Sequence, residues 1–153
     1  MTTKLGKDEQ IVREDTFTAN LILFWLKADF SLTNKRVTGH TPNTFLGLIP
    51  LGKLQMAQPL KTVSSVISST QFFFKRLLFG VILLGGGFAL MGNVFILGLI
   101  LAIFGLVSVL NCYTSTFVIT NNAGDLQAYE ISVLEKSKVE DFVNEVNTAI
   151  AEL

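Results

Sequence analysis

The sequence contains little of the chemistry that catalytic and metal sites require. Its 153 residues include one cysteine and one histidine. A lone Cys112 excludes an intrachain disulfide framework and a multi-cysteine metal site, so we expect it to act as a small apolar residue. A lone His40 has no second histidine and no cysteine cluster with which to form a metal or nucleophilic site. We therefore expect no catalytic residue, no metal and no cofactor, and the protein is not expected to be an enzyme.

Charge is absent from the 34 residues between Leu77 and Leu110. A hydrocarbon layer about 30 Å thick requires about 20 apolar residues in a helix, so this run is too long for one crossing. It predicts a transmembrane helical hairpin made of two spans, roughly Phe72–Leu90 and Val94–Cys112. The three glycines at 85–87 leave open a break in the first helix, which would give a shallow re-entrant hairpin.

The charges are divided unevenly although the net charge is zero. Ten basic and five acidic residues lie between Met1 and Arg76, whereas two basic and seven acidic residues lie between Asn111 and Leu153. Basic segments beside a membrane entry favour the cytoplasmic side, where anionic lipid attracts them. This pattern predicts a multi-pass protein of the inner (plasma) membrane with both termini in the cytoplasm.

Basic residues near the apolar run are candidate contacts with anionic lipid headgroups, each contributing about 1 kcal/mol close to the surface. For Lys75 and Arg76, orientation of the hairpin alone is the preferred explanation. For Lys35 and Arg36 both interpretations stay open. Nucleic-acid binding is not expected, because the overall charge is neutral and the basic residues adjoin the apolar run. The candidate set is Lys35, Arg36, Lys53, Lys61, Lys75 and Arg76.

Short runs on both sides of the apolar segment predict antiparallel strands. Ala28–Thr33 alternates apolar and polar residues, which is typical of a half-buried strand. Leu21–Leu26 is a run of six apolar residues and predicts a strand that is buried on both faces or lies against lipid. Asn121–Asp125 is a turn signal between two further strands. Ser137 and Glu140 match a capping box and predict an amphipathic helix that covers the sheet.

Two short segments resemble bacterial pleckstrin-homology (PH)-like or GRAM-like domains. Phe30–Val37 contains Thr-Asn-Lys-Arg at the end of a strand, and Pro59–Val66 opens with Pro-Leu and continues with β-branched residues. The last predicted strands and the helix from Ser137 are similar to the end of that family. The resemblance implies an α+β membrane protein, in which an antiparallel PH-like sheet or barrel carries a C-terminal capping helix. It also implies three parts, with N-terminal strands at 1–70, the inserted transmembrane hairpin at 71–112 and the last strands and helix at 113–153.

Self-assembly is a further expectation. Gly98 and Gly105 are seven residues apart and share one helical face, so they can serve packing within the hairpin or contact between copies of the chain. Phe45 and Leu48 belong to an apolar stretch that we interpret as lying on a bilayer or on a partner chain. The PH-like resemblance implies, by analogy, a ring-like homo-oligomer.

These observations predict a small integral membrane protein that presents a cytoplasmic PH-like domain at the inner leaflet. Its expected role is that of a scaffold or regulator, with membrane lipids, further copies of itself and an unidentified protein as partners. The alternative is an oligomeric pore, a lipid pathway or a transport accessory subunit built from the hairpins. Against a pore, the apolar run offers almost no polar residue to line water.

Overall fold

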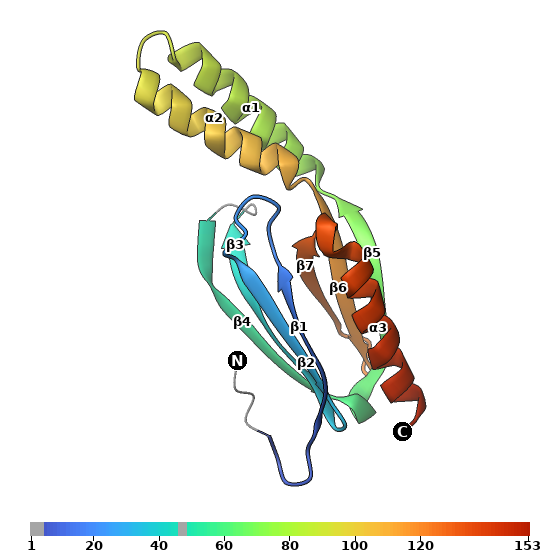
Figure 1. The fold of residues 1–153 in the computed structure, drawn as a ribbon. Coiled ribbons are helices and arrows are strands. Elements are labelled where there is room, and N and C mark those ends of the chain that lie inside the picture. Colours follow the sequence, from blue (N-terminus) through green and yellow to red (C-terminus); the bar gives the residue numbers. More distant parts are fainter. Residues whose placement is uncertain (1–4, 46–48) are drawn as a thin grey trace.

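The computed structural model describes residues 5–45 and 49–153. Two antiparallel sheets and the C-terminal helix form a two-sheet body, and a pair of helices projects from one end of it (Figure 1). The first sheet has the order β1-β2-β3-β4 and the second has the order β5-β6-β7. The elements are β1 (Ile11–Thr18), β2 (Lys27–Thr33), β3 (Arg36–Phe45), β4 (Ile49–Pro59), η1 (Leu60–Thr62), β5 (Val63–Phe72), α1 (Phe74–Leu90), α2 (Phe95–Leu110), β6 (Tyr113–Asn121), β7 (Leu126–Ser132), η2 (Val133–Glu135) and α3 (Lys136–Ala151).

An aromatic cluster fills the space between the two sheets and α3. The ring of Phe30 lies at its centre and meets four other rings at centroid distances between 5.1 and 6.1 Å. Gly39, opposite Phe30 in the β2–β3 register, makes room for this ring, since a Cβ there would lie 2.6 Å from Phe30 Cδ1. The core therefore joins segments from both sides of the projecting helices in sequence. The rings around Phe30 are Phe17, Phe117, Tyr129 and Phe142.

The C-terminal helix is the predicted amphipathic helix, whose apolar stripe is Val139, Phe142, Val143, Val146 and Ile150, but it begins differently. Glu135 is the N-cap residue of α3 and makes no side-chain capping bond. Ser137 is inside the first turn, so the predicted capping box is wrong. The hydroxyl of Ser132 instead accepts a hydrogen bond from Leu134 N in the preceding turn. The stripe itself is confirmed, because its central residues are buried; these are Val139, Phe142, Val143 and Val146.

The apolar run Leu21–Leu26 forms a loop instead of the predicted strand. Asn20 is buried, and its side-chain oxygen accepts hydrogen bonds from Ile22 N and Leu23 N, both at 2.9 Å. An asparagine that bonds the backbone two and three residues ahead stabilises a turn and removes those N–H groups from a strand ladder. The apolar composition of the run therefore predicts the wrong backbone conformation, because the side chain of Asn20 determines that conformation.

The apolar segment folds as a pair of antiparallel helices, but the predicted transmembrane hairpin is wrong. No helix within residues 5–45 and 49–153 is long and apolar enough to cross a membrane. The 17 residues of α1 and 16 residues of α2 correspond to about 25 Å each. The second sheet takes the residues that were expected to lengthen them, because Phe72 pairs with Tyr113 and Phe73 N donates to Cys112 O at 2.6 Å.

The predictions that depend on crossing are corrected with it. A multi-pass protein of the inner membrane is not supported, and neither is an integral membrane protein that presents a PH-like domain. The alternative of a pore, lipid pathway or transport accessory built from spanning hairpins is overturned by the same finding.

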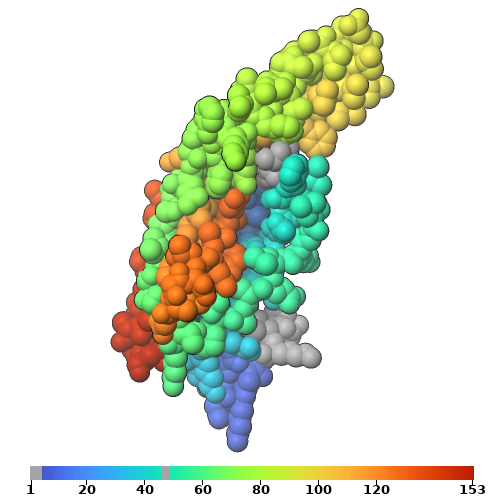
Figure 2. Space-filling model, turned by 180° about the vertical axis from the view of Figure 1, so that it is seen from behind, coloured from blue at the N-terminus to red at the C-terminus, as the bar shows by residue number. Residues whose placement is uncertain are grey.

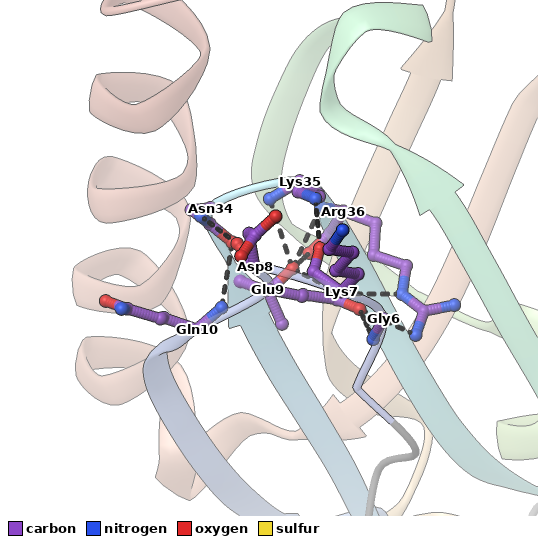
Figure 3. Close-up of polar contacts among 9 residues, drawn as sticks. Gly6, Lys7, Asp8, Glu9, Gln10, Asn34, Lys35 and Arg36 are labelled. Atoms are coloured by element: carbon purple, nitrogen blue, oxygen red, sulfur yellow. Dashed lines mark hydrogen bonds and ion pairs between the residues drawn. The ribbon is translucent and has the colours of Figure 1, made fainter.

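The N-terminal segment is held on the β2–β3 turn by several hydrogen bonds, and the carboxylate of Glu9 accepts three or more of them (Figure 3). Glu9 accepts hydrogen bonds from Gly6 N at 2.6 Å, Thr33 Oγ1 at 2.8 Å and Arg36 Nε at 2.8 Å. The backbone N–H of Gly6, followed by the guanidinium of Arg36, lowers the pKa of Glu9 from 4.5 to about 2. The ionised carboxylate therefore stabilises the folded chain.

This contact predicts a specific pH dependence of stability. Because the pKa of Glu9 is lower in the folded protein, its contribution is fully present above about pH 4.5 and is lost as the pH falls towards 2. We expect Glu9→Gln to lower the thermal midpoint at pH 7 and to converge with the wild type near pH 2. The measurement is thermal unfolding between pH 2 and 7, with the exposed Glu14→Gln as control. Equal midpoints for Glu9→Gln and wild type at pH 7 would contradict this role.

Candidate functional site

The most unusual surface of the molecule is the outside of the α1–α2 helix pair. Large apolar side chains point outward from both helices, and Ile96 and Phe88 are 73% and 65% exposed. Figure 2 shows this pair extending away from the two-sheet body. We call these outward side chains the hairpin surface. They are Phe74, Leu78, Phe79, Val81, Ile82, Phe88, Phe95, Ile96, Leu97, Leu99, Ile100, Ile103, Phe104, Leu106 and Leu110.

Small residues, by contrast, occupy the contact between α1 and α2. A Cβ added at Gly87 would lie 2.6 Å from Ala102 N and 2.8 Å from Gly98 O. A Cβ added at Gly105 would lie 2.8 Å from Gly80 O. The two backbones therefore approach each other at two levels one heptad apart. Only glycine fits this separation at these positions.

The helix pair thus has large apolar side chains outside and small residues inside. In water, burial of large apolar side chains is the main force that holds helices together. Large side chains are therefore expected between two helices in water, with polar ones outside. In hydrocarbon, the surroundings are as apolar as leucine, and close backbone packing through glycine holds helices together. An exposed apolar patch of this extent indicates an interaction surface. The arrangement suits contact with an apolar phase.

Loops of the first sheet add apolar side chains at the root of the helix pair. Trp25, the single tryptophan, is 62% exposed on the β1–β2 loop, and its ring packs edge-on against Phe24 at 5.3 Å. Leu21 N donates to Asn111 Oδ1 at 2.8 Å, which fixes this loop beside the end of α2. The end of β3 and the start of β4 lie at the same end of the body (Figure 1). Their exposed apolar residues are Phe45, Ile49 and Leu51.

A polar pocket lies beneath the helix pair, between the two sheets. Its volume is about 230 Å³, and its lining includes Arg76 from the first turn of α1 and Glu130 from β7. Arg76 Nη2 donates to Glu130 Oε2 at 2.6 Å, and its guanidinium lies 4.3 Å from the ring centre of Phe73. Asn111 and Thr114 also line the pocket and are buried.

The predicted basic contacts do not form one surface. Lys75 is exposed at the root of the helix pair, Lys53 is exposed on β4, and Arg76 is buried in its ion pair. The other three lie at the opposite end of the body, at the β2–β3 turn and η1 (Figure 1). At this end of the body, Leu60 N donates a hydrogen bond to Lys35 O at 2.9 Å. This second group is Lys35, Arg36 and Lys61.

The predicted self-assembly residues occupy different environments. Gly98 and Gly105 pack between α1 and α2, which is the first of the two roles considered for them. Phe45 is exposed at the end of β3. Leu48 lies outside the described residues.

His40 lies opposite Asp29 in the β2–β3 register and shares with it and Glu14 a pocket of about 40 Å³. Within the part of the chain that the structure describes, no group of three or more histidine, cysteine, aspartate or glutamate side chains could hold a metal ion. Cys112 is buried beside the start of β6. The absence of catalytic residues and cofactors therefore stays a prediction from the sequence.

Sequence reasoning missed Glu130, Asn111 and Thr114. Glu130 is 54 positions from Arg76, and no local pattern indicates their pairing. Asn111 carried a weak signal as the first polar residue after the apolar run. The exposure of Trp25 was detectable, because tryptophan beside a lysine is typical of a boundary between lipid and water.

Comparison with protein-family models, curated proteins and solved structures finds no match for this chain. The predicted PH-like domain interrupted by a transmembrane hairpin is therefore wrong on both counts. No family match supports the first part, and no membrane-spanning helix among the described residues supports the second. What the structure contains is a pair of antiparallel sheets, a C-terminal helix and a projecting helix pair.

Proposed function

We propose that this protein is a lipid-binding module. The hairpin surface contacts the hydrocarbon of a lipid layer, and the two-sheet body remains at the aqueous face of that layer. The observation that carries the proposal is the arrangement of α1 and α2, with large apolar side chains outside and glycines inside. Membrane lipids are the partner expected from the sequence, and the proposal requires no helix to cross the layer.

The exposed residues favour an apolar phase over a single protein partner. Phe95, Ile96 and Leu97 are consecutive and all exposed. Successive helical residues are about 100° apart, so these three side chains cover more than half of the circumference of α2. A partner protein docks on one side of a helix pair and leaves the other side in water. Lipid, by contrast, contacts every side of the part of the helix pair that enters the layer.

The root of the helix pair fits the lipid boundary. Tryptophan is enriched at the boundary between hydrocarbon and water, where its ring is apolar and its N–H is hydrated. Trp25 lies there on an exposed loop, and Lys75 is exposed at the first turn of α1. Lysine in such a place can extend its ammonium group to phosphate groups.

The expected free energy of binding is large. Burying one side chain such as leucine or phenylalanine contributes about 1.5–3 kcal/mol. Replacing two of these side chains by lysine removes two such contacts and places two charges in hydrocarbon. It should therefore weaken binding by several kcal/mol. The contribution of one exposed basic residue, about 1 kcal/mol, is much smaller. Apolar contact, rather than charge, should determine binding.

Flotation with lipid vesicles tests this prediction. We expect the wild-type protein to float with phosphatidylcholine vesicles at physiological salt, and the double variant Phe88→Lys/Ile96→Lys to remain in the dense fraction. Leu126→Lys is the matched control, because Leu126 is 69% exposed at the far end of the body and should float like the wild type. Circular dichroism verifies that all three proteins fold.

Two results would contradict lipid binding. One is that the wild-type protein stays in the dense fraction with its fold intact. The other is that the double variant floats as well as the wild type. Self-assembly stays a prediction, and its measurement is the mass of the protein with and without lipid. A defined oligomer that forms without lipid and does not float would replace the lipid proposal by contact between copies.

A further inference from the structure

We infer that the polar pocket at the root of the helix pair binds a zwitterionic lipid headgroup that carries a phosphate and a primary ammonium, as in phosphatidylethanolamine. This inference rests on the proposed lipid binding and names the headgroup chemistry that the same end of the molecule recognises. The pocket is bounded by the β1–β2 loop, β3, β4, the start of α1, the end of α2, β6 and β7, with a volume of about 230 Å³.

The charges of the pocket complement a zwitterion. Arg76 and Glu130 both line it, and their ion pair makes the lining neutral overall. A phosphate near the guanidinium and an ammonium near the carboxylate would each meet the opposite charge. An anion alone would face Glu130, and a cation alone would face Arg76. A single ligand with both charges therefore fits better than either ion.

Hydrogen-bonding capacity remains for a primary ammonium. Thr114 is 2% exposed, and its Oγ1 has no hydrogen-bond partner among the residues that the structure describes. An unpaired buried hydroxyl lowers stability unless a ligand or water satisfies it. Glu130 Oε2 is occupied by Arg76, which leaves Oε1 for another donor. These two oxygens offer acceptors to an ammonium N–H group, which the quaternary nitrogen of choline lacks.

The fold places this pocket at the depth where headgroups lie if the hairpin surface contacts hydrocarbon. Arg76 belongs to the first turn of α1, directly below the outward apolar side chains. Ser108 Oγ donates to Arg76 O at 2.9 Å, and Asn111 O accepts from Arg76 Nη1 at 3.4 Å. Arg76 is thus fixed by both helices as well as by Glu130.

The test compares vesicles whose headgroups differ only in N-methylation. Vesicles of phosphatidylcholine receive an equal fraction of phosphatidylethanolamine, its monomethyl form or its dimethyl form. We expect binding of the wild-type protein to be about tenfold tighter with phosphatidylethanolamine than with phosphatidylcholine alone, and to fall stepwise with each methyl group. Thr114→Val, which keeps the volume of the side chain, should lose this preference and still bind phosphatidylcholine. Glu130→Gln should do the same.

A soluble probe separates the headgroup from the lipid layer. Glycerophosphoethanolamine should shift the backbone amide resonances of Thr114 and Ala128, and inorganic phosphate at the same concentration should not. If phosphate causes the same shifts, the site takes free phosphate and the inference is overturned. Equal binding to all four vesicles also overturns it, while lipid binding itself stands. Failure to bind any vesicle overturns the proposed function instead.

Discussion

A Gly87→Val substitution is expected to separate α1 from α2 and to lower the stability of the helix pair by about 3 kcal/mol. The added Cβ would lie 2.6 Å from Ala102 N and 2.8 Å from Gly98 O. Both contacts are with backbone, which cannot turn aside as a flexible side chain does. The measurement is thermal loss of helical circular dichroism in lipid vesicles or detergent micelles.

Gly86→Val is the matched control, because it makes the same change one position earlier in the same helix. No described atom lies within 4 Å of a Cβ built at Gly86. Valine also has a slightly better helix propensity than glycine, so the control should be as stable as the wild type or more so. Equal loss in both variants would show that the loss does not come from close contact of the backbones at Gly87.

Phe30→Ala is expected to destabilise the two-sheet body by about 4 kcal/mol, since it removes a buried ring and leaves a cavity. Phe30 is 2% exposed and lies at the centre of the aromatic cluster. Gly39 opposite it has no side chain that could fill the space. A loss of this size is a large part of the stability of an ordinary domain. Denaturant unfolding without lipid measures it.

Phe24→Ala removes an identical ring from an exposed site and should change the free energy of unfolding by less than about 0.5 kcal/mol. Phe24 is 66% exposed on the β1–β2 loop. If Phe30→Ala unfolds at the same denaturant concentration as Phe24→Ala, the aromatic cluster is not the core of the body. Comparing the two variants also separates effects on folding from effects on lipid binding. Phe30 lies in the core, whereas Phe24 adjoins Trp25 at the proposed lipid boundary.

Local patterns predicted those elements that local chemistry determines. The alternation in Ala28–Thr33 and the turn at Asn121–Asp125 correspond to β2 and to the β6–β7 turn. The apolar stripe after Ser137 corresponds to α3. Leu21–Leu26 was misjudged because the side chain of Asn20 determines the backbone there.

The lengths of the two helices were overestimated because residues at their ends pair in the second sheet. Phe72 and Cys112 are apolar and extend the run in the sequence, but pairing of β5 with β6 removes both from the helices. The Arg76–Glu130 pair and the unbonded hydroxyl of Thr114 depend on contacts between distant segments. The periodicity of a single sequence does not indicate contacts between distant segments. The seven-residue spacing of Gly98 and Gly105 indicated one packing face with two possible partners, and the structure places that face between α1 and α2.

The measurement that tests lipid contact most directly is fluorescence quenching at the hairpin surface. In the variant Trp25→Phe/Ile96→Trp the only tryptophan lies on α2, and in Trp25→Phe/Leu126→Trp it lies at the far end of the body. Vesicles with brominated acyl chains should strongly quench the emission of the first variant and protect it from aqueous iodide, and they should leave the second unchanged. Quenching of the first variant by iodide but not by the brominated chains would contradict contact between the hairpin surface and hydrocarbon.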